Sequence, residues 1–301
     1  MSLIEQATKR LEELSQAGIA LPWGSTGLKR VNAHGGAAGE SVRAVGAVMT
    51  PMHIAKATPT PRSSKEVELD LDRLLKAGFL VPALVRSEMA AEFRLIKRPL
   101  LKSARAAGEE RSGRDNLIMV TSALAGEGKT FCAINLALSI AMEVDSSVLL
   151  VDADVSRPSV LQALGLATTA GLLDVLRDPS LDLADLILKT NIPKLSLFPA
   201  GTSDGRSTEL LASVAMERLL DELATRYPDR IIVLDAPPLL LTTESRVLAA
   251  NVGQILMVVE SSRTPQAKIA QAFATVSRCP NVTTVLNKCP KSDADNTYYG
   301  Y

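Results

Sequence analysis

The chain has 301 residues, with 33 Lys and Arg against 33 Asp and Glu, and therefore no formal net charge. Its composition, 47% hydrophobic and 22% charged, is that of a soluble globular protein, and the charge balance argues against nucleic acid as a partner. Cys132, Cys279 and Cys289 are too few and too irregularly spaced for a disulfide framework or a zinc site. This cysteine usage favours a reducing, cytoplasmic compartment. No run approaches the roughly 20 apolar residues that span a bilayer, so we expect any association with a membrane to come through a partner.

The beginning of the chain is expected to lie outside the main domain. Within an N-terminal region 1–30, residues 2–17 have the pattern of an amphipathic helix, with capping-box spacing between Ser2 and Glu5. The apolar stripe of this helix would either pack on the main domain or dock a partner, and the sequence leaves both open. Residues 31–64 are rich in Ala, Gly, Ser, Thr and Pro, which predicts a flexible linker.

The main domain, 65–290, begins with two predicted helices. Residues 65–77 carry apolar side chains at helical spacing and are followed by Gly78, a typical helix-stopping residue. The second helix covers about 87–98. We expect it to end before Pro99, because the residue that precedes a proline disfavours the helical conformation.

From residue 116 onward, apolar β-type runs alternate with helical segments. Continuous apolar strands that alternate with helices predict an α/β fold of the P-loop NTPase kind, a mostly parallel, doubly wound sheet with helices on both faces. The predicted strands are Leu117–Thr121, Val148–Val151, Leu195–Phe198, Ile231–Leu234, Ile255–Val259 and Val282–Leu286. The predicted helices lie near 129–143, 158–164, 208–226, 244–250 and 265–277.

A glycine-rich loop follows the first of these strands and leads into a helix, in the run TSALAGEGKT that ends at Thr130. Strand, glycine loop, Lys-Thr and helix form the layout of a phosphate-binding P-loop. Gly126 and Gly128 would let backbone N–H groups turn toward phosphate oxygens, Lys129 would reach the β- and γ-phosphates, and Thr130 would bind Mg²⁺. The usual first glycine is Ala123, and a plain glycine turn is the structural alternative.

Further polar residues stand at the carboxyl ends of other predicted strands. Asp152 and Asp154 follow the second strand, and Asp235 ends the run IIVLD in the pattern of a Walker B carboxylate that supports Mg²⁺. Ligands of open α/β sheets bind at this edge, so the three carboxylates are expected to lie near the P-loop. Asn287 and Lys288 end the last strand, where they would either flank a nucleotide base or form an ordinary exposed strand end.

Residues 291–301 form a polar segment that carries three of the four tyrosines, Tyr298, Tyr299 and Tyr301. The segment is too short and too polar to bury its rings, which predicts a mobile tail. Exposed aromatic residues on such a tail suit a phosphate acceptor or a recognition peptide, and an incidental tail is the alternative.

These residues resemble those of the bacterial tyrosine kinases of the polysaccharide co-polymerase class, most closely the stand-alone form associated with exosortase-type exopolysaccharide systems. The resemblance covers 65–301. It rests on a Walker A motif at 126–130, a Walker A′ motif from Asp152 to Arg157, a Walker B motif at 235–238 and the tyrosine cluster. The sequence Pro199-Ala-Gly201 with Glu209-Leu-Leu also fits.

The resemblance implies an ATP-dependent autokinase that phosphorylates Tyr298, Tyr299 and Tyr301 in a neighbouring subunit and so regulates exopolysaccharide polymerisation and export. In that scheme ATP is bound by Ala125, Gly126, Glu127, Gly128, Lys129, Thr130, Phe131, Arg157 and Asn287. Thr130, Asp152 and Asp235 hold Mg²⁺. Catalysis falls to Lys129, Asp152, Asp154 and Asp235, with Asp154 assisting the tyrosine hydroxyl. Arg94 and Lys97 occupy the basic positions of the oligomerisation motif, whose acidic position is Ala91.

The implied partners are further copies of the chain, arranged as a homo-oligomer such as a ring, a separate membrane-bound chain-length-determinant protein that activates the kinase, and a cognate tyrosine phosphatase. One rival interpretation is a partition or septum-positioning ATPase, but these carry a signature lysine where this chain has Leu124. The other is a catalytically weak, nucleotide-binding regulatory subunit.

Overall fold

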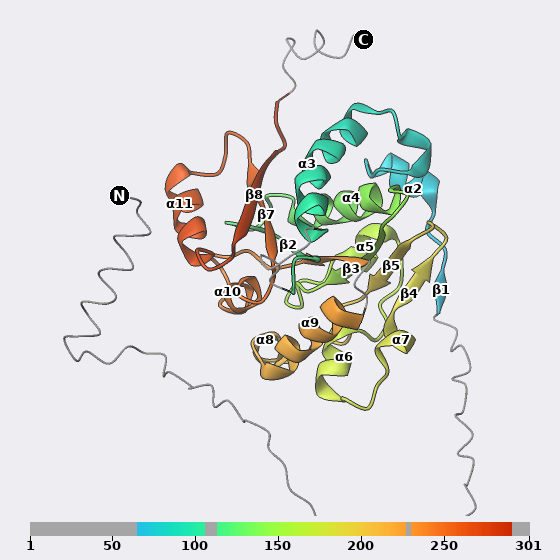
Figure 1. The fold of residues 1–301 in the computed structure, drawn as a ribbon, viewed down its shortest axis with the longest axis vertical. Coiled ribbons are helices and arrows are strands. Elements are labelled where there is room, and N and C mark those ends of the chain that lie inside the picture. Colours follow the sequence, from blue (N-terminus) through green and yellow to red (C-terminus); the bar gives the residue numbers. More distant parts are fainter. Residues whose placement is uncertain (1–64, 106–112, 227–229, 291–301) are drawn as a thin grey trace, which may run out of the picture. The chain divides into compact units, whose positions relative to one another are not determined.

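The computed structural model describes residues 65–105, 113–226 and 230–290, which form one open sheet with helices on both faces (Figure 1). The strand order is β1-β4-β5-β3-β6-β2-β7-β8, and every neighbouring pair is parallel except β4 with β5. The strands are β1 (Glu66–Val67), β2 (Leu117–Ser122), β3 (Ser147–Asp152), β4 (Leu188–Thr190), β5 (Leu195–Phe198), β6 (Arg230–Asp235), β7 (Gln254–Glu260) and β8 (Asn281–Asn287).

The helices belong to two layers. The first comprises α2 (Leu71–Lys76), the 3₁₀ helix η1 (Pro82–Leu84), α3 (Glu88–Ala104), α4 (Lys129–Ala141) and α5 (Val160–Leu164). The second comprises α6 (Leu172–Arg177), α7 (Leu183–Leu186), α8 (Ser207–Leu211), α9 (Val214–Arg226), α10 (Glu244–Ala249) and α11 (Gln266–Thr275).

Each layer buries one face of the sheet, because successive side chains of a strand point to opposite faces. In β2, Ile118 and Val120 belong to the core beneath α3 and α4, whereas Leu117 and Met119 belong to the core beneath α9 and α10. All residues of β2 are buried, which explains why its first four residues are continuously apolar rather than alternating. The predicted doubly wound, mostly parallel sheet is confirmed.

The predicted helix 65–77 is only partly correct. Glu66 and Val67 instead form β1, which pairs in parallel with β4 at the sheet edge. The helix begins after Asp70, whose side chain accepts a hydrogen bond from the backbone N–H of Arg73 at 3.0 Å. The predicted end is confirmed, because Gly78 adopts a positive φ of 82° just beyond it.

The predicted end of the next helix at Pro99 is wrong, because α3 continues to Ala104 with Pro99 inside it. Pro99 has no N–H group to donate to the carbonyl of Leu95, four residues earlier in the helix. Leu95 is 64% exposed, so this carbonyl lies on the solvent-facing side of α3. Leu100 and Leu101 are buried against the core on the next turn, and this packing outweighs the cost of the proline.

The predicted helix 208–226 is two helices, α8 and α9, separated at Ala212 and Ser213. The Ser213 hydroxyl donates to the carbonyl of Leu210 and accepts from the backbone N–H of Met216, so it closes one helix and caps the next. The short elements β4, α6 and α7 were not predicted. The predicted helix 2–17, the linker and the tail 291–301 lie outside the described residues.

A hydrophobic membrane span is also missing from this part of the chain: none of its helices combines the length and the apolar character that crossing a bilayer requires.

Candidate nucleotide and phosphoryl-transfer site

The carboxyl ends of β2, β3 and β6 surround a cavity of about 470 Å³. Lys129 and the loop before it form one wall, the segment after β3 forms a second, and the loop after β6 forms a third. The lining residues are Ala125, Gly126, Lys129, Asp154, Ser156, Arg157, Ser159, Pro237, Pro238, Leu241 and Thr242. Three segments that are far apart in the sequence therefore meet where the motifs predicted a ligand.

The P-loop requires glycine at Gly128 for two reasons. Its φ of 96° lies in the left-handed region that favours glycine, and a Cβ added there would come within 2.0 Å of the Asn287 side-chain nitrogen. Gly126 also has a positive φ, of 85°, but no atom approaches its missing side chain. Helix α4 begins immediately after Gly128, so its N-terminal N–H groups face the cavity end of the loop.

Lys129 is held by one carboxylate. Its Nζ lies 2.7 Å from Oδ2 of Asp154, and both side chains are largely shielded from solvent, with 14% and 4% exposed. The amide N–H of Arg157 donates to the other Asp154 oxygen at 3.2 Å. The Arg157 side chain itself is exposed at the rim of the cavity.

Asp152 and Asp235 are direct neighbours across the β3–β6 pair. Oδ2 of Asp152 accepts hydrogen bonds from the N–H groups of Ser159 and Val160, each at 3.0 Å, while its Oδ1 is buried with no partner. Asp235 is fully buried, and neither of its oxygens makes a hydrogen bond of ordinary geometry. Thr130, the second residue of α4, shares a hydrogen bond of 3.1 Å with the Ser159 hydroxyl.

The two buried carboxylates disfavour each other's negative charge. Burial raises the pKa of Asp235 to about 7, and the neighbouring Asp152 adds to the rise, while Lys129 and the Thr130 hydroxyl oppose it. Burial also raises the pKa of Asp152 to about 6 against the lowering effect of its two backbone hydrogen bonds. Burial and Asp235 raise the pKa of the Cys132 thiol to about 12. Burial therefore disfavours the negative charge of both carboxylates in the free protein.

Mg²⁺ fits this donor set. Three carboxylate oxygens without partners lie beside a threonine hydroxyl, and Mg²⁺ binds through one or two carboxylates together with substrate phosphates. Within residues 65–105, 113–226 and 230–290, no group of three or more His, Cys, Asp or Glu side chains could hold a metal alone. A ligand phosphate would thus complete the coordination.

Glu127 is buried, and its side chain stabilises the P-loop from behind. The carboxylate accepts from the N–H of Leu124 at 2.6 Å and from the hydroxyl of Thr264. Its backbone carbonyl accepts from the Asn287 side chain at 2.8 Å. Glu127 and Asn287 are both predicted to bind nucleotide, and in this structure the Asn287 side chain is hydrogen-bonded to the Glu127 backbone.

Lys288 extends the same connection. Its Nζ donates to the carbonyl of Gly126 at 2.7 Å and pairs with Glu260 at 3.2 Å. The sequence predicts that Lys288 either flanks a nucleotide base or forms an ordinary exposed strand end, and neither alternative includes a bond to the P-loop. Thr264 and Glu260 carry no sequence signal for this contact. No motif spacing connects these residues, because the contact exists only through the pairing of β7 with β8.

The remaining predicted residues lie away from the cavity. Phe131 stacks on Phe79, with ring centroids 5.5 Å apart, and packs against the core. Lys97 is buried, donates to the carbonyl of Ser139 at 2.6 Å and pairs with Glu143 at 2.7 Å. Arg94 is partly exposed and donates to the carbonyl of Val85. An oligomer contact through Arg94 and Lys97 stays a prediction.

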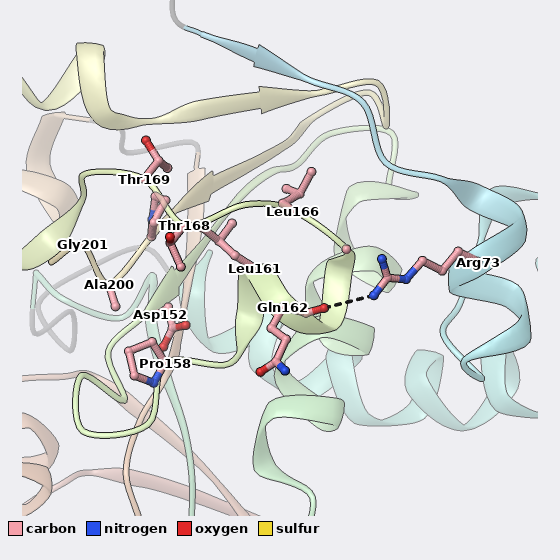
Figure 2. A pocket seen from close by; sticks show the side chains of 12 residues that line it. Arg73, Asp152, Pro158, Leu161, Gln162, Leu166, Thr168, Thr169, Ala200 and Gly201 are labelled. Carbon is pink, nitrogen blue, oxygen red and sulfur yellow. Dashed lines mark hydrogen bonds between the residues drawn. The ribbon is translucent and has the colours of Figure 1, made fainter. Parts of the chain in front are cut away.

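Asp152 also lines a second cavity, of about 400 Å³, between α5 and the segment that contains Gly201 (Figure 2). Arg73 reaches its rim from α2 and donates to the carbonyl of Gln162 at 3.4 Å. This second cavity shares Asp152 with the carboxylate site, and no sequence motif connects its other walls with that site.

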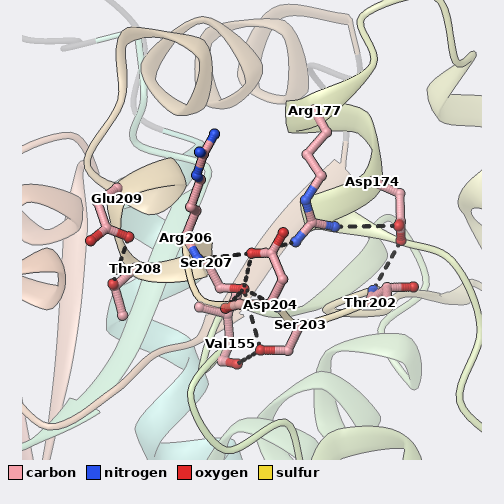
Figure 3. A network of polar contacts seen from close by, with 10 residues as sticks. All are labelled: Val155, Asp174, Arg177, Thr202, Ser203, Asp204, Arg206, Ser207, Thr208 and Glu209. Carbon is pink, nitrogen blue, oxygen red and sulfur yellow. Dashed lines mark hydrogen bonds and ion pairs between the residues drawn. The ribbon is translucent and has the colours of Figure 1, made fainter.

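The Pro199-Ala-Gly201 motif lines this second cavity and also contacts the start of α6. The carbonyls of Pro199 and Ala200 accept from the first N–H groups of α6, and Gly201 approaches Asp174 so closely that an added Cβ would lie 2.3 Å from its carboxylate. Figure 3 shows the polar network that continues from Asp174 through Arg177 to Asp204.

Comparison with known proteins gives a consistent result. Residues 115–284 match the protein family described as the AAA domain. Tyrosine-protein kinase YwqD of Bacillus subtilis (strain 168) is 30% identical over 184 residues, which cover 61% of this chain and 76% of that protein. Putative tyrosine-protein kinase EpsB of Ralstonia nicotianae is 32% identical over 190 residues, and these cover 62% of this chain but only 24% of that protein.

The fold also matches a solved structure. The kinase domain of the Escherichia coli tyrosine kinase ETK superimposes with a TM-score of 0.60, at 24% identity, over 74% of this chain and 86% of that one. At this level of identity the match establishes the fold alone.

Proposed function

Because the chain belongs to the bacterial tyrosine-protein kinases with an AAA domain, we propose that it transfers the γ-phosphoryl group of ATP to Tyr298, Tyr299 and Tyr301 of a second copy. The observation that carries this proposal is the set of three buried carboxylate oxygens without partners, one on Asp152 and two on Asp235, beside the P-loop lysine. Such a set is costly in the free protein and becomes favourable when cationic and phosphate groups arrive together.

Thr130, Asp152 and Asp235 would hold Mg²⁺. When bound, the ion supplies charge neutralisation for the β- and γ-phosphates. The residues of the chain would do the rest by position: the loop N–H groups and the start of α4 bind the phosphates, and Lys129 stabilises charge that develops on the transferred group. Arg157 lines the rim of the cavity and would contact the nucleotide from the solvent side.

Lys129 and Asp154 would exchange partners during the reaction. In this structure they neutralise each other at 2.7 Å. If the Lys129 ammonium moves toward the phosphates of ATP, the carboxylate of Asp154 is released to accept the proton of the acceptor tyrosine. A phenol has a pKa of about 10, so at pH 7 it needs a base or firm positioning to attack.

A mixing experiment tests both the chemistry and the direction of transfer. One chain keeps its catalytic residues but carries Phe in place of Tyr298, Tyr299 and Tyr301; the other carries Lys129→Ala and an intact tail. With Mg-ATP, we expect mass spectrometry to find phosphotyrosine on the Lys129→Ala chain only in the mixture. Tyr227, outside the cluster, serves as the internal control.

The other outcomes identify the rivals. Hydrolysis of ATP without any phosphotyrosine would indicate a partition-type ATPase. Binding of ATP with neither hydrolysis nor phosphotyrosine would indicate a regulatory nucleotide-binding subunit. Phosphotyrosine on the wild-type chain alone and never in the mixture would show transfer within one chain and contradict transfer between copies.

The wider assignments rest on the sequence resemblance. These are assembly into a homo-oligomer, activation by a separate membrane-bound protein, reversal by a tyrosine phosphatase and a role in exopolysaccharide polymerisation and export. Sedimentation of the purified chain at several concentrations tests the first: a mass that stays at 32.0 kDa throughout would contradict it.

A further inference from the structure

Helix α3 carries a basic groove on its outer surface, away from the carboxylate site. The groove has a volume of about 320 Å³ and is lined by Arg94, Arg98, Leu101, Lys102, Arg105 and Glu143. The four cationic positions follow one another at spacings of four, four and three, which places them on one face of the helix. We use the name α3 basic groove for these six residues.

The cationic side chains of the α3 basic groove make few hydrogen bonds and ion pairs within the described residues. Among the described residues, Arg98 and Lys102 are exposed and make no hydrogen bond or ion pair. Arg94 and Arg105 each donate one hydrogen bond, to the carbonyl of Val85 and to the hydroxyl of Ser146, which fixes the guanidinium groups and leaves further N–H donors.

The single anion of the groove is already neutralised. Glu143 pairs with the buried Lys97 at 2.7 Å, so it does not cancel the charge of the four cations. The floor is apolar, because Leu101 is 6% exposed at the base. Guanidinium groups bind phosphate through paired hydrogen bonds and stack on aromatic faces, so arginine walls over an apolar floor suit an aryl phosphate.

We propose that the α3 basic groove binds the phosphorylated tail, residues 291–301, of another copy of the chain. The tail contains three tyrosines and two aspartates against one lysine, and each phosphate adds about −1.5 to −2 charges. The fully phosphorylated tail thus carries roughly −6, and it supplies the aromatic ring and the phosphate on the same side chain. This inference rests on the proposed function only for the origin of the phosphates.

A lipid surface is the competing occupant, and the helix is less suited to it. Glu88 and Glu92 are exposed on the N-terminal half of α3, where they would repel anionic headgroups. The cations also line a concave groove instead of projecting from a convex face, and three of the four are arginines.

Peptide binding tests the proposal without any kinase reaction. The full chain with Lys129→Ala is titrated against a labelled synthetic peptide of residues 291–301 with phosphate on all three tyrosines, and fluorescence anisotropy reports binding. We expect affinity at least about ten-fold higher than for the unphosphorylated peptide, weakened by salt. Equal affinity for the two peptides would overturn the proposal.

Two charge-reversed pairs locate the site. Arg98→Glu with Lys102→Glu should weaken binding of the phosphopeptide at least about ten-fold, whereas Lys268→Glu with Arg278→Glu, the same charge change at exposed positions on and after α11, should change it less than about two-fold. Arg98→Gln with Lys102→Gln, which avoids new repulsion, should give an intermediate loss. Equal losses from both reversed pairs would show general charge attraction and contradict a site.

A vesicle assay separates the competing occupant. The Lys129→Ala chain is sedimented with vesicles of phosphatidylcholine that contain anionic phosphatidylserine. We expect that reversing the charges of Arg98 and Lys102 does not change the fraction of the chain that sediments with the vesicles. Vesicle binding that the reversed α3 pair abolishes, together with no binding of phosphopeptide, would make this a membrane surface. If the peptide binds but the wild-type chain never forms phosphotyrosine with Mg-ATP, the groove stands and the proposed kinase reaction on this tail fails.

Discussion

Two aspartate clusters on this fold show opposite ways of placing carboxylates. In the network of Figure 3, Asp174 accepts from the N–H groups of Gly171 and Thr202 and pairs with Arg177, which also pairs with Asp204. At the strand tips, by contrast, Asp152 keeps one oxygen and Asp235 keeps both without a partner. The first cluster is complete in the chain alone, and the second is complete only with a ligand.

The pKa directions express the same difference. The backbone N–H of Arg206, together with Arg177, lowers the pKa of Asp204, whereas burial raises the pKa of Asp235 to about 7. A satisfied carboxylate stabilises the fold in its charged form, whereas an unsatisfied one destabilises the fold in that form. We therefore expect substitutions in the two clusters to have opposite effects on stability and unequal effects on activity.

The largest expected effect is on catalysis at Asp235. Asp235→Asn keeps the shape of the side chain but removes the charge that would hold Mg²⁺. We expect phosphotyrosine formation to fall at least about 1,000-fold, the scale that charge-neutralising groups contribute to phosphoryl transfer. Quantitative mass spectrometry of Tyr298, Tyr299 and Tyr301 over time measures it, with Lys129→Ala as the inactive reference. A loss below ten-fold would remove Asp235 from the reaction.

The same substitution should stabilise the metal-free protein. The carboxyl is neutral in both states below pH 4; between about pH 4 and 7 the unfolded chain loses the proton that folded Asp235 retains. The free energy of unfolding should therefore fall as pH rises through this window, by up to about 4 kcal/mol at 1.4 kcal/mol per unit. Urea unfolding in EDTA should give Asp235→Asn a higher free energy of unfolding than the wild type at pH 8 and an equal one at pH 4. An unchanged difference across pH would contradict this account.

A substitution in the cluster around Asp174 should lower the free energy of unfolding instead of raising it. Asp174→Ala leaves the N–H groups of Gly171 and Thr202 without their acceptor, and hydrogen bonds to a charged group contribute about 1.5–3 kcal/mol each. We expect the free energy of unfolding to drop by about 2–3 kcal/mol at pH 7 while the folded fraction keeps its kinase activity. Asp145→Ala, at an exposed aspartate after α4, is the control and should change stability by less than about 0.5 kcal/mol.

The smallest expected effect lies at Ser207 in the same network. Its buried hydroxyl donates to the carbonyl of Asp204 at 2.9 Å and lies 2.8 Å from the Asp204 amide, which donates to it. Ser207→Ala should cost about 1 kcal/mol of unfolding free energy, the usual contribution of a neutral hydrogen bond. A stability change as large as that of Asp174→Ala would mean that the Ser207 hydroxyl contributes as much as the carboxylate, and would contradict the expected order.

Sequence patterns predicted the parts of the molecule that depend on local chemistry. All six predicted strands and the P-loop followed from apolar runs and glycine spacing, and register then placed Asp152 beside Asp235 as expected. The patterns failed where tertiary packing overrides a local preference, as at Pro99 in α3, and for two-residue elements such as β1. They also could not show that Lys288 bonds to the carbonyl of Gly126, because that contact needs two strands and a loop together.

The three thiols have a practical consequence. Cys132 and Cys279 are buried, and burial raises the pKa of each, so neither readily forms the thiolate that alkylating reagents attack. Cys289 is exposed, two residues beyond β8 and immediately before the tail. A maleimide dye added to the native protein should therefore attach at Cys289 alone, and it would place a fluorescent reporter two residues before the segment 291–301 without any engineered cysteine.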